Sequence, residues 1–135
     1  MDLDRALSIS AAGMAAQSTR LRVVAENIAN RDSTGQSAGA EPYRRKTVSF
    51  GSRLDRSLGA ETVRVSRIGQ APGAFPERFD PSHPAADARG YVKTPNVDSL
   101  IENMDMREAN RSYSANLAVL ETMRGMLMRA IETLR

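Results

Sequence analysis

The first 30 residues carry an apolar side chain at every seventh position: Leu7, Met14, Leu21 and Ile28. A repeat of this period places its members along one face of an α-helix, where they can pack against a neighbouring element. The companion row on that face is half polar and consists of Leu3, Ser10, Gln17 and Val24. The pattern predicts one long N-terminal helix whose packing face is incompletely apolar.

The last segment, residues 96–135, has a more continuous repeat. Two seven-residue rows run through it: Met106, Tyr113, Leu120, Leu127 and Leu134, and Ala109, Asn116, Met123 and Ala130. A double row of this kind is the packing seam of a coiled coil. Leu117 and Ile131 widen the seam, which indicates contacts on more than one side. We therefore expect this helix to be the stable scaffold and the N-terminal helix to depend on partners for its order.

Helix breakers are concentrated between the two repeats. All six prolines and seven of the nine glycines lie in residues 31–95. Alternation of polar and apolar residues at 47–50 and 62–66 predicts short strands, and few large side chains are available for a core. After Pro95, either Asn96 or Asp98 can cap the start of the C-terminal helix.

These patterns together predict a mainly α fold with a small β-rich insert. The expected divisions are an N-terminal helix (1–30), a central β-rich or irregular module (31–95) and a C-terminal heptad helix (96–135). We expect the two helices to pair as an α-helical coiled coil and to form one terminal domain.

The net charge of +3 is unevenly distributed. The central segment has 11 basic and 7 acidic residues, whereas residues 1–30 are neutral and residues 96–135 carry −1. The only basic run is Arg44, Arg45 and Lys46. A solvated loop is the favoured interpretation of this run, and contact with an acidic partner or with nucleic-acid phosphates is the alternative.

No residue pattern points to catalysis, a cofactor or a metal ion. The chain has no cysteine and a single histidine, and the acidic residues are scattered singly over positions expected to face solvent. His83 lies close to Asp80 and Ser82, but its position between Pro81 and Pro84 favours a rigid turn over a hydrolytic site. An acidic start and interrupted apolar runs argue against a cleaved signal peptide, and we expect no membrane insertion.

Both ends of the chain resemble flagellar basal-body rod and hook proteins. The motifs that carry the resemblance are SAAGM at 10–14, NIAN at 27–30 and RSYSAN at 111–116. Within that family, the middle of the chain is similar to the proximal rod proteins through PYRRK at 42–46, DPSHPAAD at 80–87, GYV at 90–92 and PNV at 95–97.

The resemblance implies a structural subunit that is exported unfolded and uncleaved by the flagellar type III export apparatus. It implies polymerisation into the rod, the drive shaft that crosses the periplasm and serves motility. The implied partners are copies of the chain itself, other rod proteins, and the base of the rod at the MS ring and export gate. No nucleic acid is implied as a partner.

On this basis the terminal helices form the inner tube and the middle segment forms outer contacts. The expected helix-packing and assembly residues are Leu7, Met14, Leu21, Asn27, Ile28, Asn30, Met106, Tyr113, Asn116, Leu117, Leu120, Met123, Leu127, Ile131 and Leu134. The expected outer contacts are Tyr43, Arg44, Arg45 and Lys46. Asn27, Asn30 and Asn116 would form hydrogen bonds that fix helix register, although a simple helix-terminus role is equally expected for the first two.

Two other function classes are weighed against the rod subunit. The first is a basic coiled-coil adaptor that binds nucleic acid or an acidic partner through Arg44, Arg45 and Lys46. The second is a wall-cutting hydrolase, which would require a pair of carboxylates in a recognisable context that the sequence does not offer.

Overall fold

The computed structural model describes residues 3–134, so Met1, Asp2 and Arg135 of the expected helical segments lie outside the described residues. The elements in chain order are α1 (Leu3–Ala29), β1 (Lys46–Asp55), β2 (Ala60–Gln70), β3 (Glu77–Phe79), β4 (Tyr91–Lys93) and α2 (Ser99–Thr133). The predicted mainly α fold with a small β insert is confirmed.

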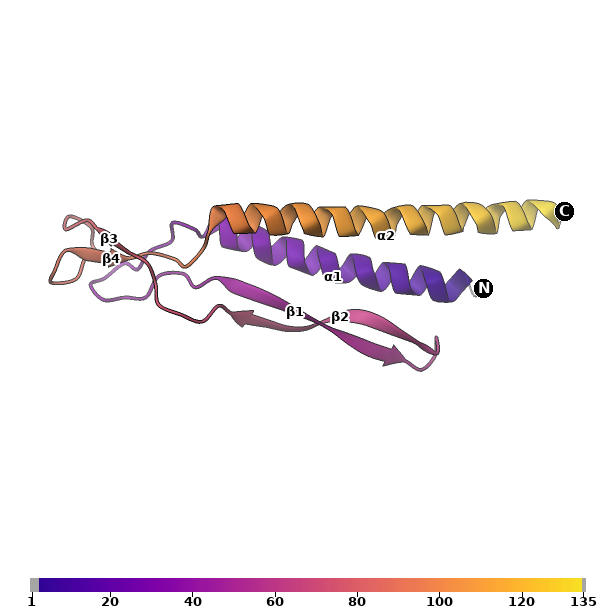
Figure 1. The fold of residues 1–135 in the computed structure, drawn as a ribbon, viewed down its shortest axis with the longest axis horizontal. Helices are drawn as coiled ribbons and strands as arrows, with labels where there is room; N and C mark the ends of the chain where they lie inside the picture. Colours follow the sequence, from indigo (N-terminus) through magenta and orange to yellow (C-terminus); the bar gives the residue numbers. More distant parts are fainter. Residues whose placement is uncertain (1–2, 135) are drawn as a thin grey trace.

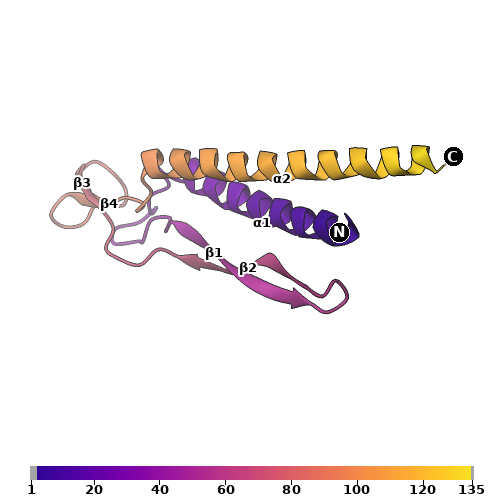
Figure 2. The same ribbon diagram turned by 45° about the vertical axis from the view of Figure 1, so that its right-hand side comes forward.

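The two helices and the β1–β2 hairpin form three layers with α1 in the middle (Figure 1). The helices run antiparallel, and α2 packs on the side of α1 that faces away from the hairpin, an arrangement that persists when the molecule is turned (Figure 2). Arg20 of α1 forms an ion pair with Asp105 of α2 at 2.8 Å, while Arg5 donates a hydrogen bond to the Gly59 carbonyl oxygen at the hairpin turn. Among the described elements, α2 packs only against α1.

Burial is concentrated on α1. Its buried residues are Ser10, Ala16, Val23, Val24 and Asn27, whereas α2 buries only Glu102 and Ala109. The expectation that the C-terminal helix would be the scaffold is therefore wrong for the single chain. The reason is positional, because α1 is covered on two sides and α2 on one. In the half-polar companion row of α1, Ser10 and Val24 are buried, whereas the buried Oε1 of Gln17 has no hydrogen-bond partner within the described residues.

The β1–β2 hairpin is antiparallel and contains one bulge. Ser49 pairs with Arg67 and Phe50 with Val65, which leaves Ser66 as an extra residue on β2. The Ser66 hydroxyl donates to the Ser49 carbonyl oxygen at 3.0 Å and so fixes the bulge.

A second, shorter strand pair lies at the opposite end from the chain termini (Figure 1). It joins β3 and β4 and brings Phe79 and Tyr91 edge to face, with ring centroids 5.3 Å apart. Gly90, just before β4, has a φ of +83°, and a Cβ there would lie 3.0 Å from the Phe79 ring. Glycine is thus required for this turn.

Helix α2 begins where the sequence indicated. The Asp98 carboxylate accepts hydrogen bonds from the backbone N–H groups of Leu100 (2.8 Å) and Ile101 (3.4 Å), so Asp98 is the N-cap. The other candidate, Asn96, instead accepts a hydrogen bond from the Arg45 backbone N–H at 2.8 Å. The two polar residues after Pro95 therefore have different tasks, one capping α2 and one anchoring the segment that leads into β1.

Candidate functional site

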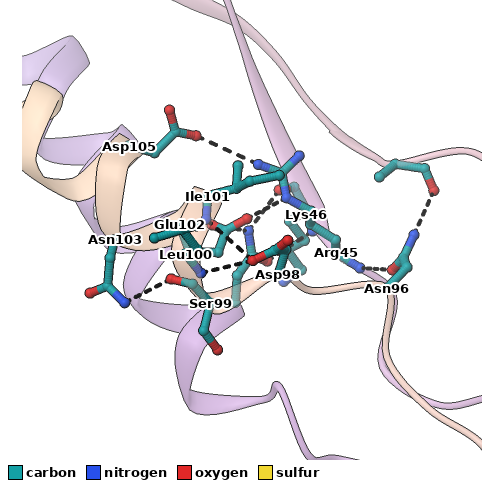
Figure 3. A network of polar contacts seen from close by, with 12 residues as sticks. Arg45, Lys46, Asn96, Asp98, Ser99, Leu100, Ile101, Glu102, Asn103 and Asp105 are labelled. Atoms are coloured by element: carbon teal, nitrogen blue, oxygen red, sulfur yellow. Dashed lines mark hydrogen bonds and ion pairs between the residues drawn. The ribbon is translucent and has the colours of Figure 1, made fainter. Parts of the chain in front are cut away.

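The end of α1, the beginning of β1 and the first turn of α2 meet in a cluster of polar side chains, part of which Figure 3 shows. We call this cluster the polar junction; its members are Asn27, Tyr43, Arg45, Lys46, Glu102 and Asp105. It is the only place where side chains from both helices and from the hairpin strand are joined by hydrogen bonds within residues 3–134.

Asn27 is the centre of the polar junction. Its side-chain NH₂ donates to the Lys46 carbonyl oxygen (2.9 Å) and to Glu102 Oε2 (3.1 Å). Its Oδ1 accepts from the Lys46 backbone N–H (2.9 Å) and from the Tyr43 hydroxyl (2.8 Å). The residue is only 1% exposed, and its full hydrogen-bonding capacity is used. Asn27 therefore does more than close the end of α1, since its hydrogen bonds join α1 to α2 and to the segment that begins β1.

The other two asparagines act locally. Asn30 donates to the Glu26 carbonyl oxygen (2.9 Å) and accepts from the Ser33 hydroxyl (3.0 Å), so it closes the end of α1. Asn116 donates to the Ser112 carbonyl oxygen within α2 (2.9 Å). Its amide also fills the space beside Gly13, where a Cβ would lie 2.9 Å from Asn116 Oδ1. Gly13 and Asn116 thus set a close approach of the two helices.

Glu102 corrects the expectation that the acidic residues face solvent. Its side chain is 0% exposed and forms an ion pair with Arg45. Arg45 also reaches Asp105 Oδ2 at 3.5 Å, and Asp105 in turn binds Arg20 of α1. A signal for this residue was present in the sequence, because Glu102 lies seven positions before Ala109 and continues that row of the heptad seam.

The basic run is not a solvated loop, and that interpretation is wrong. The Arg44 guanidinium lies over the Phe75 ring, 4.1 Å from its centroid, and donates to the carbonyl oxygens of Ala71 and Gly73. Lys46 forms an ion pair with Glu26. Together with the Arg45 pairs, these contacts engage all three cations within the chain: carboxylates of α1 and α2 pair with Lys46 and Arg45, and backbone carbonyls and an aromatic ring hold Arg44. An additional role for this run as an outer contact in an assembly stays a prediction.

Tyr43 is held neutral at the edge of the polar junction. Burial raises the pKa of its hydroxyl above the ordinary value, and the negative charges of Glu26 and Glu102 raise it further. The neutral hydroxyl is the form that donates to Asn27 Oδ1. Tyr43 therefore belongs to the interior of the chain as much as to its surface.

The expected packing residues divide into two groups. Half-buried in the single chain are Leu7, Met14, Leu21, Ile28, Met106, Tyr113, Leu120 and Met123. Exposed are Leu117, Leu127, Ile131 and Leu134. Leu7, Leu120 and Leu127 line a shared groove between the helices, so part of the predicted seam contacts α1 within the single chain; pairing of the helices as a regular coiled coil stays a prediction.

Towards its C-terminal end, α2 continues past the beginning of α1 (Figure 1). The exposed apolar side chains of the C-terminal half of α2, partly alongside α1 and partly beyond it, are Leu117, Val119, Met126, Leu127, Met128, Ile131 and Leu134, and we call them the open apolar surface of α2. Leu134 is 88% exposed. A shallow groove lined by Ala118, Val119, Thr122, Met123 and Met126 runs along the same part of the helix. Exposed apolar side chains in this number on one stretch of helix are typical of a site that binds another protein.

His83 occupies a turn, as the sequence favoured. Its Nδ1 accepts a hydrogen bond from the Ala85 backbone N–H at 3.0 Å, and its Nε2 lies 3.3 Å from the Thr34 hydroxyl. The Ser82 hydroxyl donates to Asp80 and not to the imidazole. Within residues 3–134, no group of three or more histidine and acidic side chains could hold a metal ion. None of the described helices is both long enough and apolar enough to cross a membrane.

Comparisons with known proteins bear on the whole chain. A family model described as "Flagella basal body rod protein" matches residues 7–35, and one described as "Flagellar basal body rod FlgEFG protein C-terminal" matches residues 88–133. The first lies largely on α1, and the second includes β4 and α2. The matches are to rod proteins and not to enzymes, and they give no support to an adaptor that binds nucleic acid.

Full-length relatives agree with the family models. The flagellar basal-body rod protein FlgC of Agrobacterium fabrum is 53% identical over 133 residues, which are 98% of this chain and 96% of the relative. The FlgC proteins of Salmonella typhimurium (40% identical, covering 97% of each chain) and Bacillus subtilis (39% identical, covering 93% of this chain and 94% of the relative) are also similar. The chain belongs to the FlgC family of flagellar basal-body rod proteins.

Proposed function

We propose that this chain, a structural subunit of the proximal rod of the flagellar basal body, polymerises through α1 and α2. The supporting observation is the open apolar surface of α2. A single chain cannot cover this surface, because α1 packs on one side of α2 and does not extend to its C-terminal end, and the hairpin lies on the other side of α1 (Figure 2). Copies of the chain and other rod proteins would supply the missing neighbours, with their helices completing the coiled-coil seam.

Burial of these side chains between subunits would contribute to the stability of an assembly. Fully burying a leucine, isoleucine or methionine side chain stabilises by about 1.5–3 kcal/mol. Leu127, Ile131 and Leu134 are between 40% and 88% exposed, so much of that energy is still available in the single chain. Three such side chains together offer roughly 3–5 kcal/mol per subunit, before the entropy of association is subtracted.

The small core of the single chain also fits export before folding. Within residues 3–134, its buried apolar residues besides proline and glycine are Ala16, Val23, Val24, Ala85, Val92 and Ala109. A chain that gains much of its burial from neighbours is marginally stable alone and can be kept unfolded for transport. We propose export by the flagellar type III apparatus without a cleaved signal, followed by assembly in the periplasm on the base of the rod at the MS ring and export gate.

Paired substitutions on α2 test the proposal. Leu127→Gln with Ile131→Gln should prevent swimming in soft agar and remove the chain from isolated basal bodies, while synthesis continues. Arg129→Gln with Thr133→Gln, at exposed positions in the same turns, should leave both readouts unchanged. Deleting the last two turns, which include Leu127, Ile131 and Leu134, should match the first variant. Normal swimming of the apolar variant or of the truncation would contradict the proposal.

A further inference from the structure

The positive charge of the chain resides on one ribbon. Residues 46–70, which form the β1–β2 hairpin, contain five basic and two acidic residues. Their excess of +3 equals the net charge of the whole chain, so the other segments balance one another. The charge is therefore a property of the hairpin and not of the surface in general.

The bulge gathers three of the hairpin arginines on one face. Directly paired residues share a face of a sheet, and alternate residues of a strand return to it. Arg53 of β1 shares its face with Gly51 and Ser49, and the residues paired with these two are Arg64 and Arg67. Arg64 and Arg67 are three positions apart and would lie on opposite faces of a regular strand. The extra residue, Ser66, brings them together, and we call Arg53, Arg64 and Arg67 the arginine face.

The arginine face is not neutralised within the chain. All three side chains are exposed, and none forms an ion pair within residues 3–134, although eight ion pairs form elsewhere. The carboxylate on the same face is Asp55, which accepts hydrogen bonds from the Ser57 hydroxyl (2.6 Å) and backbone N–H (2.9 Å). These hydrogen bonds lower the pKa of Asp55 most, and the charge of Arg53 lowers it further, so Asp55 compensates Arg53 only in part. Like charges on neighbouring strands destabilise a hairpin. A bulge that collects them therefore indicates a partner outside the chain.

Two exposed carboxylates lie on one side of α2, each with an arginine, Arg124 or Arg129, three positions away. Glu121 and Glu132 are exposed and form no ion pair within the described residues. Eleven residues make just over three helical turns, so both glutamates lie on one side of α2, about 16 Å apart. Arg53 and Arg67 are separated by four residue pairs along the hairpin, which is about 14 Å. The distance between Arg53 and Arg67 along the hairpin is therefore similar to the distance between the two glutamates along α2.

These two surfaces cannot meet within one chain. The hairpin packs on α1, and α2 lies on the opposite side of α1 (Figures 1 and 2). We propose that the arginine face of one copy binds the Glu121–Glu132 side of α2 in the next copy. Because this interface joins two different surfaces of identical chains, the first subunit of an array keeps one of them free and the last subunit keeps the other. Repeating such a contact generates a helical array. This contact rests on the proposed rod function. Its charge pairs would fix how one subunit is aligned along the next, in addition to the apolar burial between helices.

The placement of the apolar hairpin residues argues against an anionic lipid surface as the partner. Leu54 and Ile68 are exposed, but the register puts them on the face opposite the arginines. A membrane-surface ribbon would insert its apolar residues while its basic residues flank them at the headgroups. A partner that presents carboxylates to one face of the ribbon fits the arrangement better, since the planar guanidinium binds them through two parallel hydrogen bonds.

Cross-linking tests the contact directly, because the chain has no cysteine of its own. Cells that carry Arg64→Cys with Glu121→Cys as their only copy should yield covalent dimers and higher multimers in isolated basal bodies after treatment with a short bismaleimide. Each single variant should yield none. Arg64→Cys with Glu108→Cys is the matched control, since Glu108 is exposed on a different side of α2.

The outcomes separate this contact from the proposed function. Rods that contain the double-cysteine chain but give no multimers, or give as many as the Glu108 control, would overturn the contact and leave the rod function intact. Absence of the unmodified chain from basal bodies would instead contradict the rod function.

Charge exchange provides a second measurement. Arg53→Glu, Arg64→Glu and Arg67→Glu together should reduce the amount of chain in basal bodies by about tenfold or more, because like charges would then face each other. Adding Glu121→Arg and Glu132→Arg should restore most of it. A defect that the exchange does not relieve would overturn the contact between copies and indicate an acidic surface on a different rod protein. Circular dichroism of the purified variants should match the unmodified chain.

Discussion

Replacing Glu102 with glutamine should destabilise the single chain more than any other neutralising change on α2. The two groups that face the Glu102 carboxylate, Arg45 Nε and the side-chain NH₂ of Asn27, are both hydrogen-bond donors. A carboxylate offers two acceptor oxygens, whereas an amide offers one oxygen and one further donor. In Glu102→Gln, either orientation of the glutamine amide places its NH₂ group against one of these two donors. The negative charge that pairs with Arg45 is lost as well.

The expected loss can be estimated from the exposure of the partners. Breaking a fully buried ion pair costs about 3–5 kcal/mol, because the remaining charge is left without compensation. The Arg45 side chain is 24% exposed and keeps Asp105 as a partner, so part of its charge stays solvated and paired. We therefore expect Glu102→Gln to lower the free energy of unfolding by about 2–3 kcal/mol.

Urea unfolding of the purified chain, followed by circular dichroism, measures this loss as a shift of the transition midpoint at constant slope. The matched control is Asp105→Asn, which removes a carboxylate that is 35% exposed and is expected to cost less than about 1 kcal/mol. If Glu102→Gln and Asp105→Asn lie within about 0.5 kcal/mol of each other, the view of Glu102 as the buried anchor of the polar junction is wrong.

Three further predictions concern other contacts. Tyr43→Phe should cost about 1 kcal/mol at neutral pH. The pKa of Tyr43 is raised in the folded chain, so its contribution is complete below its ordinary pKa of 10.0 and is lost as the pH rises through the folded-state pKa; the variant should lack that part of the alkaline decline in a pH series of urea titrations. Gly13→Ala should lower the melting temperature, since the added Cβ meets Asn116, and Asn116→Ala in the same chain should relieve part of this effect, which a double-mutant cycle measures. Asp98→Ala removes the N-cap of α2 and should lower the free energy of unfolding in urea by about 1 kcal/mol. In the double variant, Asn103→Ala should add only the loss that it causes as a single substitution.

The helices were predictable from the sequence because their signals are local. Seven-residue repeats, the absence of proline from both ends and the capping residue Asp98 each act within a few positions of the chain. The hairpin was predictable only as a tendency, since alternation at 47–50 and 62–66 identifies strands but not their pairing. The position of the bulge at Ser66 is set by the register of two strands together, and no single strand contains it.

The polar junction could not be derived from the sequence in the same way. Arg45 and Glu102 are 57 residues apart, and nothing in the basic run distinguishes a residue that meets a buried carboxylate from one that meets water. The one available signal was the charged residue at a heptad position, where an apolar side chain would be the rule. Burial follows from which elements cover a position, and the covering of α1 by both α2 and the hairpin is a property of the tertiary fold.

The unequal length of the two helices has a consequence for how growth of the rod would be sustained. With 35 and 27 residues, α2 and α1 are about 52 and 40 Å long, so α2 projects by roughly two turns. A subunit that covers this projection on the one before it brings a projection of its own. Each addition thus regenerates the docking position that it consumes, and the number of subunits in the rod must be limited by something other than the subunit itself.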